Sequence, residues 1–130
     1  MATAKISDRL FVQVLTNLAS LYTKVSVGTG TQFFNDTDTE LNDPVLIQSG
    51  LYGVGFDSVT VTGSNQINFS GFLESGEPVT QPVLIGEIGV VDSTGSLNNL
   101  GVGAKLNVQV TKDNTARFRI RGALGVGRIN

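Results

Sequence analysis

The chain has 130 residues, of which 40% are hydrophobic and 15% charged, a net charge of −2, sixteen glycines, and neither Cys nor His. The length suits one domain spanning residues 1–130, and the composition excludes a disordered chain and favours a β protein with many turns. Without Cys and His, disulfides, zinc–thiolate sites and His-dependent catalytic triads are excluded.

The N-terminal segment MATAKISDRL predicts no signal peptide, because Lys5, Asp8 and Arg9 are not preceded by an apolar stretch. No run approaches the roughly 20 apolar residues that span a membrane. We therefore expect a protein that is synthesised in a cytoplasm and has no membrane partner.

Residues 7–23 predict an amphipathic helix. One apolar row has a four-residue spacing (Leu10, Val14, Leu18), and an adjoining row contains Phe11, Leu15, Leu18 and Tyr22. Ser7 or Asp8 is suited to cap its N-terminus. Such a helix packs on the sheet of its own domain, or it presents an apolar face to a partner.

The remainder, about residues 24–128, predicts an antiparallel β-sandwich of about six or more strands. After the short strand TKVSVG, β-rich segments occupy residues 45–63, 65–75, 82–93, 100–114 and 116–127. Turn-forming residues predict hairpins at 62–66, 92–97 and 112–116. The Gly-Val-Gly triplet, which occurs at 53–55, 101–103 and 125–127, predicts positions where strands bend or bulge.

The segment between residues 25 and 45, VSVGTGTQFFNDTDTELNDPV, contains two glycines, Gly28 and Gly30, followed by four acids: Asp36, Asp38, Glu40 and Asp43. A phosphate cradle is disfavoured, since phosphate would meet carboxylates there. Asp36, Asp38 and Glu40 alternate like calcium ligands, but the EF-hand spacing and its glycine are missing, so they are weak metal candidates. We expect a structural crossover in which Phe33 and Phe34 dock on the subunit or on a neighbour.

Glu87 lies inside the apolar strand VLIGEIGVV. Strict alternation puts it on one face with Ile85, Gly89 and Val91. A carboxylate in that place must be paired or exposed, and we expect a structural pair with an arginine rather than a catalytic acid.

Arg117, Arg119 and Arg121 alternate with apolar residues in ARFRIRG, so they share one face of a strand. Residues 1–24 carry a net charge of +2, residues 105–130 carry +5, and residues 25–104 hold nine acids and no Lys or Arg. The arginine stripe therefore salt-bridges acids of the same subunit, or it meets the acidic face of a neighbouring copy. Nucleic acid is not the expected partner, because the chain is acidic overall.

Three segments together resemble the N-terminal domains of tail-collar and tail-fibre proteins of tailed bacteriophages. The matching positions are Val27–Thr31 in VSVGTGT, Thr39–Leu41 in TELNDPV, and Glu87–Asp92 with Gly95 and Leu97 in EIGVVDSTGSL. The resemblance covers about residues 20–100. Since such proteins often continue into a fibre shaft and this chain ends at Asn130, a stand-alone adaptor, collar or decoration subunit is expected.

The resemblance implies a non-enzymatic structural protein of the virion, in the tail, collar, baseplate or fibre attachment, without cofactors. Its partners are expected to be other virion proteins and copies of itself, as a homo-oligomer. The alternatives are a capsid decoration protein and a receptor- or carbohydrate-binding β-sandwich module. The absence of Trp weakens the carbohydrate-binding alternative.

Overall fold

A computed structural model describes residues 7–63 and 65–125, which form one helix and two antiparallel sheets. The first sheet has the order β2-β1-β5-β6 and the second the order β3-β4-β7. The predicted sandwich with an N-terminal helix is confirmed. The elements are α1 (Asp8–Leu21), β1 (Lys24–Gly28), β2 (Val54–Gly55), β3 (Ser58–Thr62), β4 (Gln66–Leu73), β5 (Val83–Val91), β6 (Leu100–Lys112) and β7 (Phe118–Gly125).

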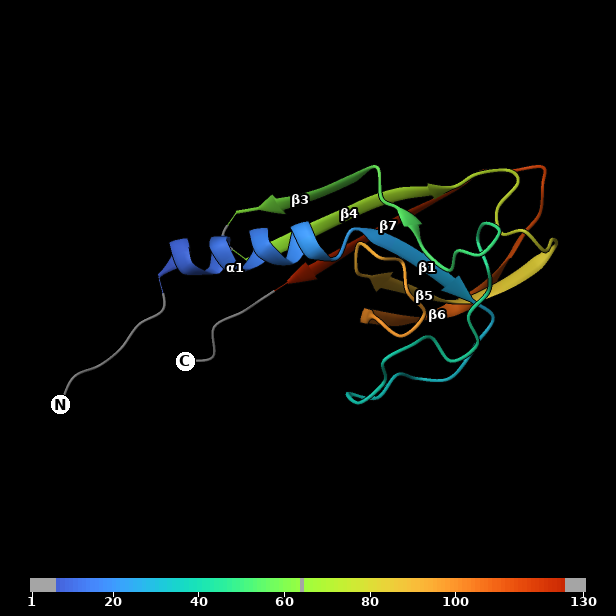
Figure 1. Ribbon diagram of the computed structural model, residues 1–130, viewed down its shortest axis with the longest axis horizontal. Coiled ribbons are helices and arrows are strands. Elements are labelled where there is room, and N and C mark those ends of the chain that lie inside the picture. The colour runs from blue at the N-terminus through green and yellow to red at the C-terminus, as the bar shows by residue number, and fades with distance from the viewer. Residues whose placement is uncertain (1–6, 64, 126–130) are drawn as a thin grey trace.

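The helix and the four-stranded sheet share the inner face of the three-stranded sheet. Figure 1 shows α1 beside β3, β4 and β7 at one end of the molecule, with β1, β5 and β6 toward the other end. Two apolar clusters match this division. One is centred on Leu15, Ile67 and Phe69, and the other on Val25, Val27 and Leu73.

The helix buries one row of its apolar residues and leaves another row exposed. Ser7 caps it by accepting a hydrogen bond from the backbone N–H of Leu10, as the sequence predicted. Leu15 is fully buried against β3 and β4, whereas Leu10 and Val14 are nearly half exposed. The helix therefore packs on the sheet of its own domain and also presents apolar surface.

Two of the three predicted hairpins are confirmed and one is wrong. The turns at 62–66 and 92–97 join strands that pair with each other. The turn at 112–116 does not, because β6 and β7 belong to different sheets. Turn residues permit the chain to reverse, but strand packing decides whether it returns to the same sheet.

The β-rich stretch 45–63 is also not one strand. Its first part is mostly irregular, and the rest divides into β2, which pairs with β1, and β3, which pairs with β4. The chain thus crosses from one sheet to the other between Gly55 and Ser58.

An irregularity in the pairing of β5 with β6 overturns the strict alternation predicted for β5. The pairing with β6 shifts between Ile85 and Glu87, so that Ile85 and Ile88 both pack in the core cluster. Glu87, on the other side of the shift, faces away from that cluster toward the connection after β1. Two steps along β5, from Ile85 to Glu87, correspond to five steps along β6, from Val110 to Lys105. The regular ladder is interrupted there, so the facing of the residues before the interruption does not continue after it.

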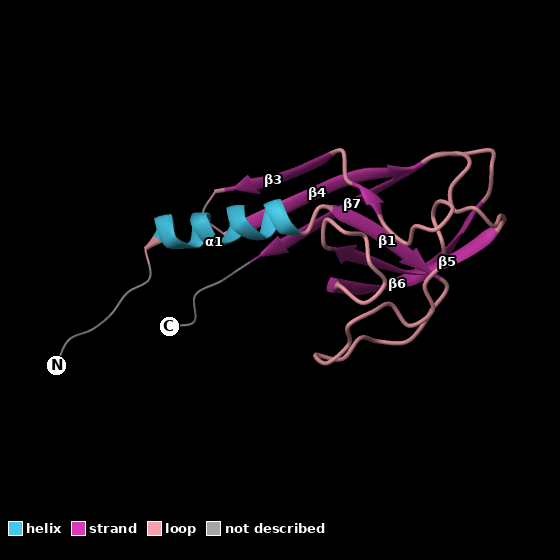
Figure 2. Cartoon of the chain, in the orientation of Figure 1, coloured by secondary structure: helices cyan, strands magenta, loops and turns pink. Residues whose placement is uncertain are grey.

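The first part of the long connection between β1 and β2, residues 29–43, lies on the outer face of the four-stranded sheet, and Figures 1 and 2 show it as a loop layer below β1, β5 and β6. Farther along, Val45 and Ile47 pack in the inner core cluster. Leu41 of this connection is buried against Gly89 of β5, and the ring of Phe34 lies against Gly103 of β6. The glycines of this strand therefore accommodate aromatic rings. Gly101, beneath Tyr22, also lies at a register shift, as predicted for the Gly-Val-Gly triplet. The triplet at 125–127 lies largely outside the described residues.

Replacing Leu15 with Ala should destabilise the domain by about 2–5 kcal/mol, because the site is fully buried and a cavity would remain. The matched change of Leu10, which is 47% exposed, should cost less than about 1 kcal/mol. Urea unfolding followed by circular dichroism measures both. Equal effects of the two substitutions would contradict the packing of the helix described above.

Candidate functional site

The carboxylate of Glu87 fastens the connection after β1 to the sheet. Glu87 is fully buried, and its two oxygens accept hydrogen bonds from the backbone N–H groups of Asp43, at 2.7 Å, and Asn42, at 3.2 Å. The prediction that Glu87 pairs with an arginine is therefore wrong. A buried carboxylate needs hydrogen-bond donors, and main-chain N–H groups supply them as well as a guanidinium does.

Gly28 and Gly30 are required because the Glu87 carboxylate occupies the space of a side chain. A Cβ atom on Gly28 would lie 2.3 Å from Glu87 Oε1, and one on Gly30 would lie 2.5 Å from Glu87 Oε2. The carbonyl of Gly30 in turn lies over Gly86, leaving no space for a Cβ there. These glycines are structural, as the sequence predicted, and they permit the backbone to approach the carboxylate closely.

The acids of the connection do not converge on a metal site. Asp38 accepts a hydrogen bond from the backbone N–H of Asn35, and Asp43 accepts one from the Thr29 hydroxyl, while Asp36 and Glu40 are exposed. Within residues 7–63 and 65–125, no group of three His, Cys, Asp or Glu side chains is placed to hold a metal ion. The alternation of Asp36, Asp38 and Glu40 is thus a feature of an acidic surface.

The two phenylalanines of the connection have different surroundings. Phe34 is half-buried on Gly103 and docks on its own subunit. Phe33 is 81% exposed, and its ring contacts the Lys105 ammonium, 4.6 Å from the ring centroid. An exposed phenylalanine of this kind is typical of surfaces that bind a partner.

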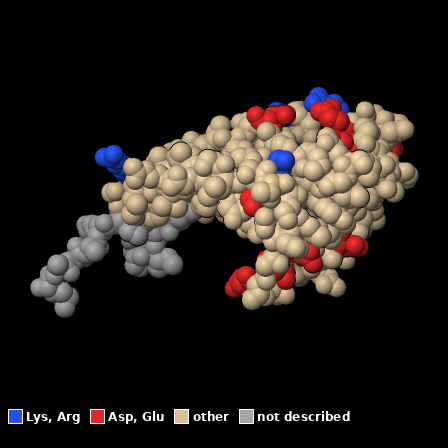
Figure 3. Space-filling model, viewed as in Figure 1, with Lys and Arg blue, Asp and Glu red and all other residues tan. Residues whose placement is uncertain are grey.

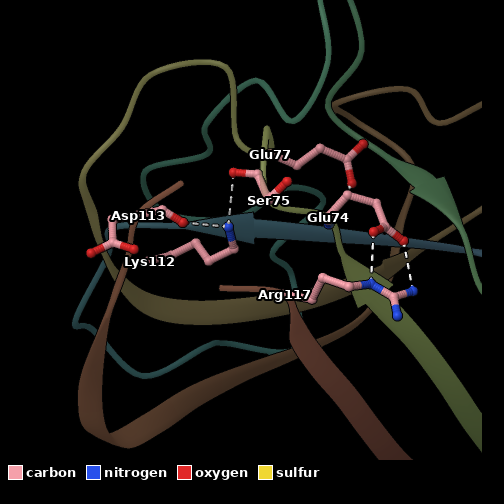
Figure 4. Close-up of polar contacts among 6 residues, drawn as sticks. All are labelled: Glu74, Ser75, Glu77, Lys112, Asp113 and Arg117. Carbon is pink, nitrogen blue, oxygen red and sulfur yellow. Dashed lines mark hydrogen bonds and ion pairs between the residues drawn. The ribbon is translucent and has the colours of Figure 1, made fainter. Parts of the chain in front are cut away.

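The arginine stripe on β7 lies at the edge of the three-stranded sheet. Arg117 forms a two-bond ion pair with Glu74, at 2.7 and 2.9 Å (Figure 4). Its guanidinium also lies 4.0 Å from the Phe72 ring centroid. Arg119 stacks more loosely on the same ring, at 5.3 Å. Neither Arg119 nor Arg121 forms an ion pair with any residue that the structure describes. The stripe therefore pairs with acids in its own subunit at one position only.

The ion pair shifts the pKa values of both Glu74 and Arg117. The hydrogen bonds from the Arg117 guanidinium hold the pKa of Glu74 below its ordinary value of 4.5. The same bonds raise the pKa of Arg117. Since both side chains are more than half exposed, solvent screens their attraction.

Lys112, which sequence reasoning did not single out, is fully buried. Its ammonium donates to the backbone carbonyl oxygens of Asp113, at 2.8 Å, and Ser75, at 3.4 Å (Figure 4). It also lies 5.6 Å from the Phe118 ring centroid. Lys112 thus ties the turn after β6 to the turn after β4. In sequence it is an ordinary lysine of a polar turn, so no pattern distinguishes it.

The surface shows the charge segregation of the sequence. Figure 3 shows carboxylates gathered along the edge where the connection 29–52 lies, while basic groups on the opposite edge lie beside other carboxylates. Among the described residues, no helix has the length and apolar character needed to cross a membrane.

Comparison with protein-family models gives no match, and comparison with curated proteins gives no significant match. The functional argument therefore depends on the geometry of this chain.

Replacing Gly30 with Ala should destabilise the domain by about 1–3 kcal/mol, because the new methyl group would overlap the Glu87 carboxylate. Gly55→Ala is the matched control, since a Cβ atom there meets nothing within 4 Å. Thermal unfolding compares the two variants, and amide exchange at Asn42 and Asp43 should accelerate only in Gly30→Ala. Full protection of both amides in that variant would argue against the anchoring role of Glu87.

Glu74→Gln should lower the stability near neutral pH and have no effect in strongly acid buffer. The folded-state pKa of Glu74 is lowered, so its stabilisation is present above about pH 4.5 and is lost as the pH falls through the folded value. Denaturant midpoints at several pH values measure the difference from the unmodified chain. Glu40→Gln, at an exposed acid, is the control, and an equal pH dependence in both variants would refute the assignment.

Proposed function

We propose that this chain is a non-enzymatic structural subunit of a tailed-phage virion that acts through repeated protein–protein contacts. Its place would be the tail, collar, baseplate or fibre attachment. One observation carries the proposal: the three short segments that resemble tail-collar and tail-fibre proteins, although distant in sequence, lie together around Glu87.

The contacts among these segments are specific. Gly28 and Gly30, from the first segment, lie against Glu87 of the third. The second segment contributes Leu41, which is buried over Gly89, and the carbonyl of Thr39, which accepts a hydrogen bond from the N–H of Leu100. A motif that gathers in this way maintains a fold, which supports a structural role better than a catalytic one.

The surface also supports a role in contacts. The connection held by Glu87 presents Phe33 and exposed acids, and β7 presents Arg119 and Arg121 without ion-pair partners among the described residues. Complementary charges on different parts of one chain favour association between copies. Capsid decoration would use the same surfaces, and particle labelling distinguishes the two locations.

A carbohydrate-binding module is the second candidate. A hollow of about 330 Å³ on the three-stranded sheet is lined by Ser58, Thr60, Asn68, Ser70 and Arg121, which suit hydroxyl recognition. Its aromatic lining residue, Phe69, is buried in the core. The hollow therefore offers hydrogen bonds without the exposed aromatic platform on which sugars stack, and the structural role is favoured.

Antibodies against the chain should label the tail or its attachment points in particles made by the phage genome that encodes it. Immunogold electron microscopy is the measurement, and a particle lacking the gene product is the control. Labelling confined to the capsid surface would indicate decoration instead. Particles free of the protein, with the protein detected only in infected cells, would contradict the proposal.

A further inference from the structure

An apolar cleft separates the two sheets where the strands β6 and β7 lie at sheet edges. Its volume is about 400 Å³, within the range of about 300–1,000 Å³ that is usual for binding pockets. Leu106 and Val110 of β6 line one side, Phe118 and Ile120 of β7 line the other, and Arg117 and Arg119 also contribute. The cleft therefore combines apolar walls with positive charge.

The tip of the connection has the complementary character. Phe33 exposes 81% of its surface, and the exposed acids Asp36 and Glu40 follow it in the chain. An exposed aromatic ring that loses its water on binding, with charged residues beside it, is a common form of interface anchor. The ring already contacts one cation, Lys105, in its own subunit, so a guanidinium beside it is compatible with its surroundings.

We propose that the cleft between β6 and β7 binds the Phe33 tip of a second copy of this chain, with Asp36 and Glu40 facing Arg119. This inference rests on the proposed function and names its contact surface. The occupant is a second copy because one chain carries both halves of the complementary pair: an acidic aromatic tip and a basic apolar cleft.

The Phe33 tip and the cleft lie on different faces of one chain, so the contact between copies is heterologous. Residues 29–43 of the connection lie on the outer face of the four-stranded sheet, where Phe34 lies on Gly103, whereas the cleft is lined by inner-face residues such as Ile85. The tip therefore lies across the sheet from the cleft of its own chain. Each copy uses its tip toward one neighbour and its cleft toward the other, which produces a ring or a filament.

Two complementary variants test this arrangement. Phe33→Ser removes the tip and keeps the cleft, while Arg119→Glu reverses a charge that lines the cleft and keeps the tip. Each variant alone should self-associate at least about tenfold more weakly than the unmodified chain, as expected for loss of an interface anchor. Light scattering and sedimentation at low and high salt measure the association.

Mixing the two variants gives the decisive result. One intact contact remains between them, from the tip of the arginine variant to the cleft of the Phe33 variant. We therefore expect a 1:1 complex with no larger species, and this complex should dissociate as salt is raised. An isologous dimer would also keep one tip–cleft contact on mixing, so species larger than a dimer in the unmodified chain are what distinguish a heterologous contact.

Matched controls separate a contact effect from misfolding or from general loss of charge. Leu51→Ser changes another exposed apolar residue of the same connection, and Arg9→Glu reverses an exposed charge on α1; both should associate like the unmodified chain. Thermal unfolding checks that every variant is folded.

Three outcomes would overturn the inference: an unmodified chain that stays monomeric at high concentration, variants that associate normally, and mixed variants that form no complex. None of these outcomes contradicts the proposed role in the virion, which the particle labelling tests separately. If labelling succeeds and mixing fails, the subunit meets other virion proteins through these surfaces.

Discussion

The buried carboxylate of Glu87 is the contact on which the arrangement of this molecule depends. It lies in the centre of a sheet, yet its hydrogen-bond donors are main-chain N–H groups of a distant connection, those of Asn42 and Asp43. Leaving a carboxylate buried without partners is costly, so the acid and the connection stabilise each other. The two glycines pressed against the carboxylate make this approach sterically permissible.

The irregular pairing of β5 with β6 between Ile85 and Glu87 makes this contact possible. In a regular strand Glu87 would share the face of Ile85, which packs in the core, and a carboxylate in that core would have no donors. The register shift between these two residues turns Glu87 outward, where the connection passes. A local irregularity in one strand thus decides how a segment more than 40 positions earlier in the chain is held.

The sequence was sufficient for the fold class and the helix, and it narrowed the cap to Ser7 or Asp8, because these follow from local periodicity and turn chemistry. It was insufficient for the sheet assignment of β6 and β7, since the turn at 112–116 is compatible with either arrangement. The partners of Glu87 and the burial of Lys112 were also inaccessible. Both depend on backbone groups brought close by tertiary packing, and backbone groups leave no trace in the pattern of side chains.

The choice of main-chain donors for Glu87 also affects the surface. Had Glu87 paired with an arginine, as its position suggested, the basic end of the chain would have been partly neutralised inside the subunit. Instead Glu74 holds Arg117, and Arg119 and Arg121 remain exposed without ion-pair partners among the described residues. Asp36 and Glu40 of the connection likewise stay at the surface. Satisfying a buried acid with backbone groups therefore leaves opposite charges on separate surfaces, where they favour contact between molecules over contact within one.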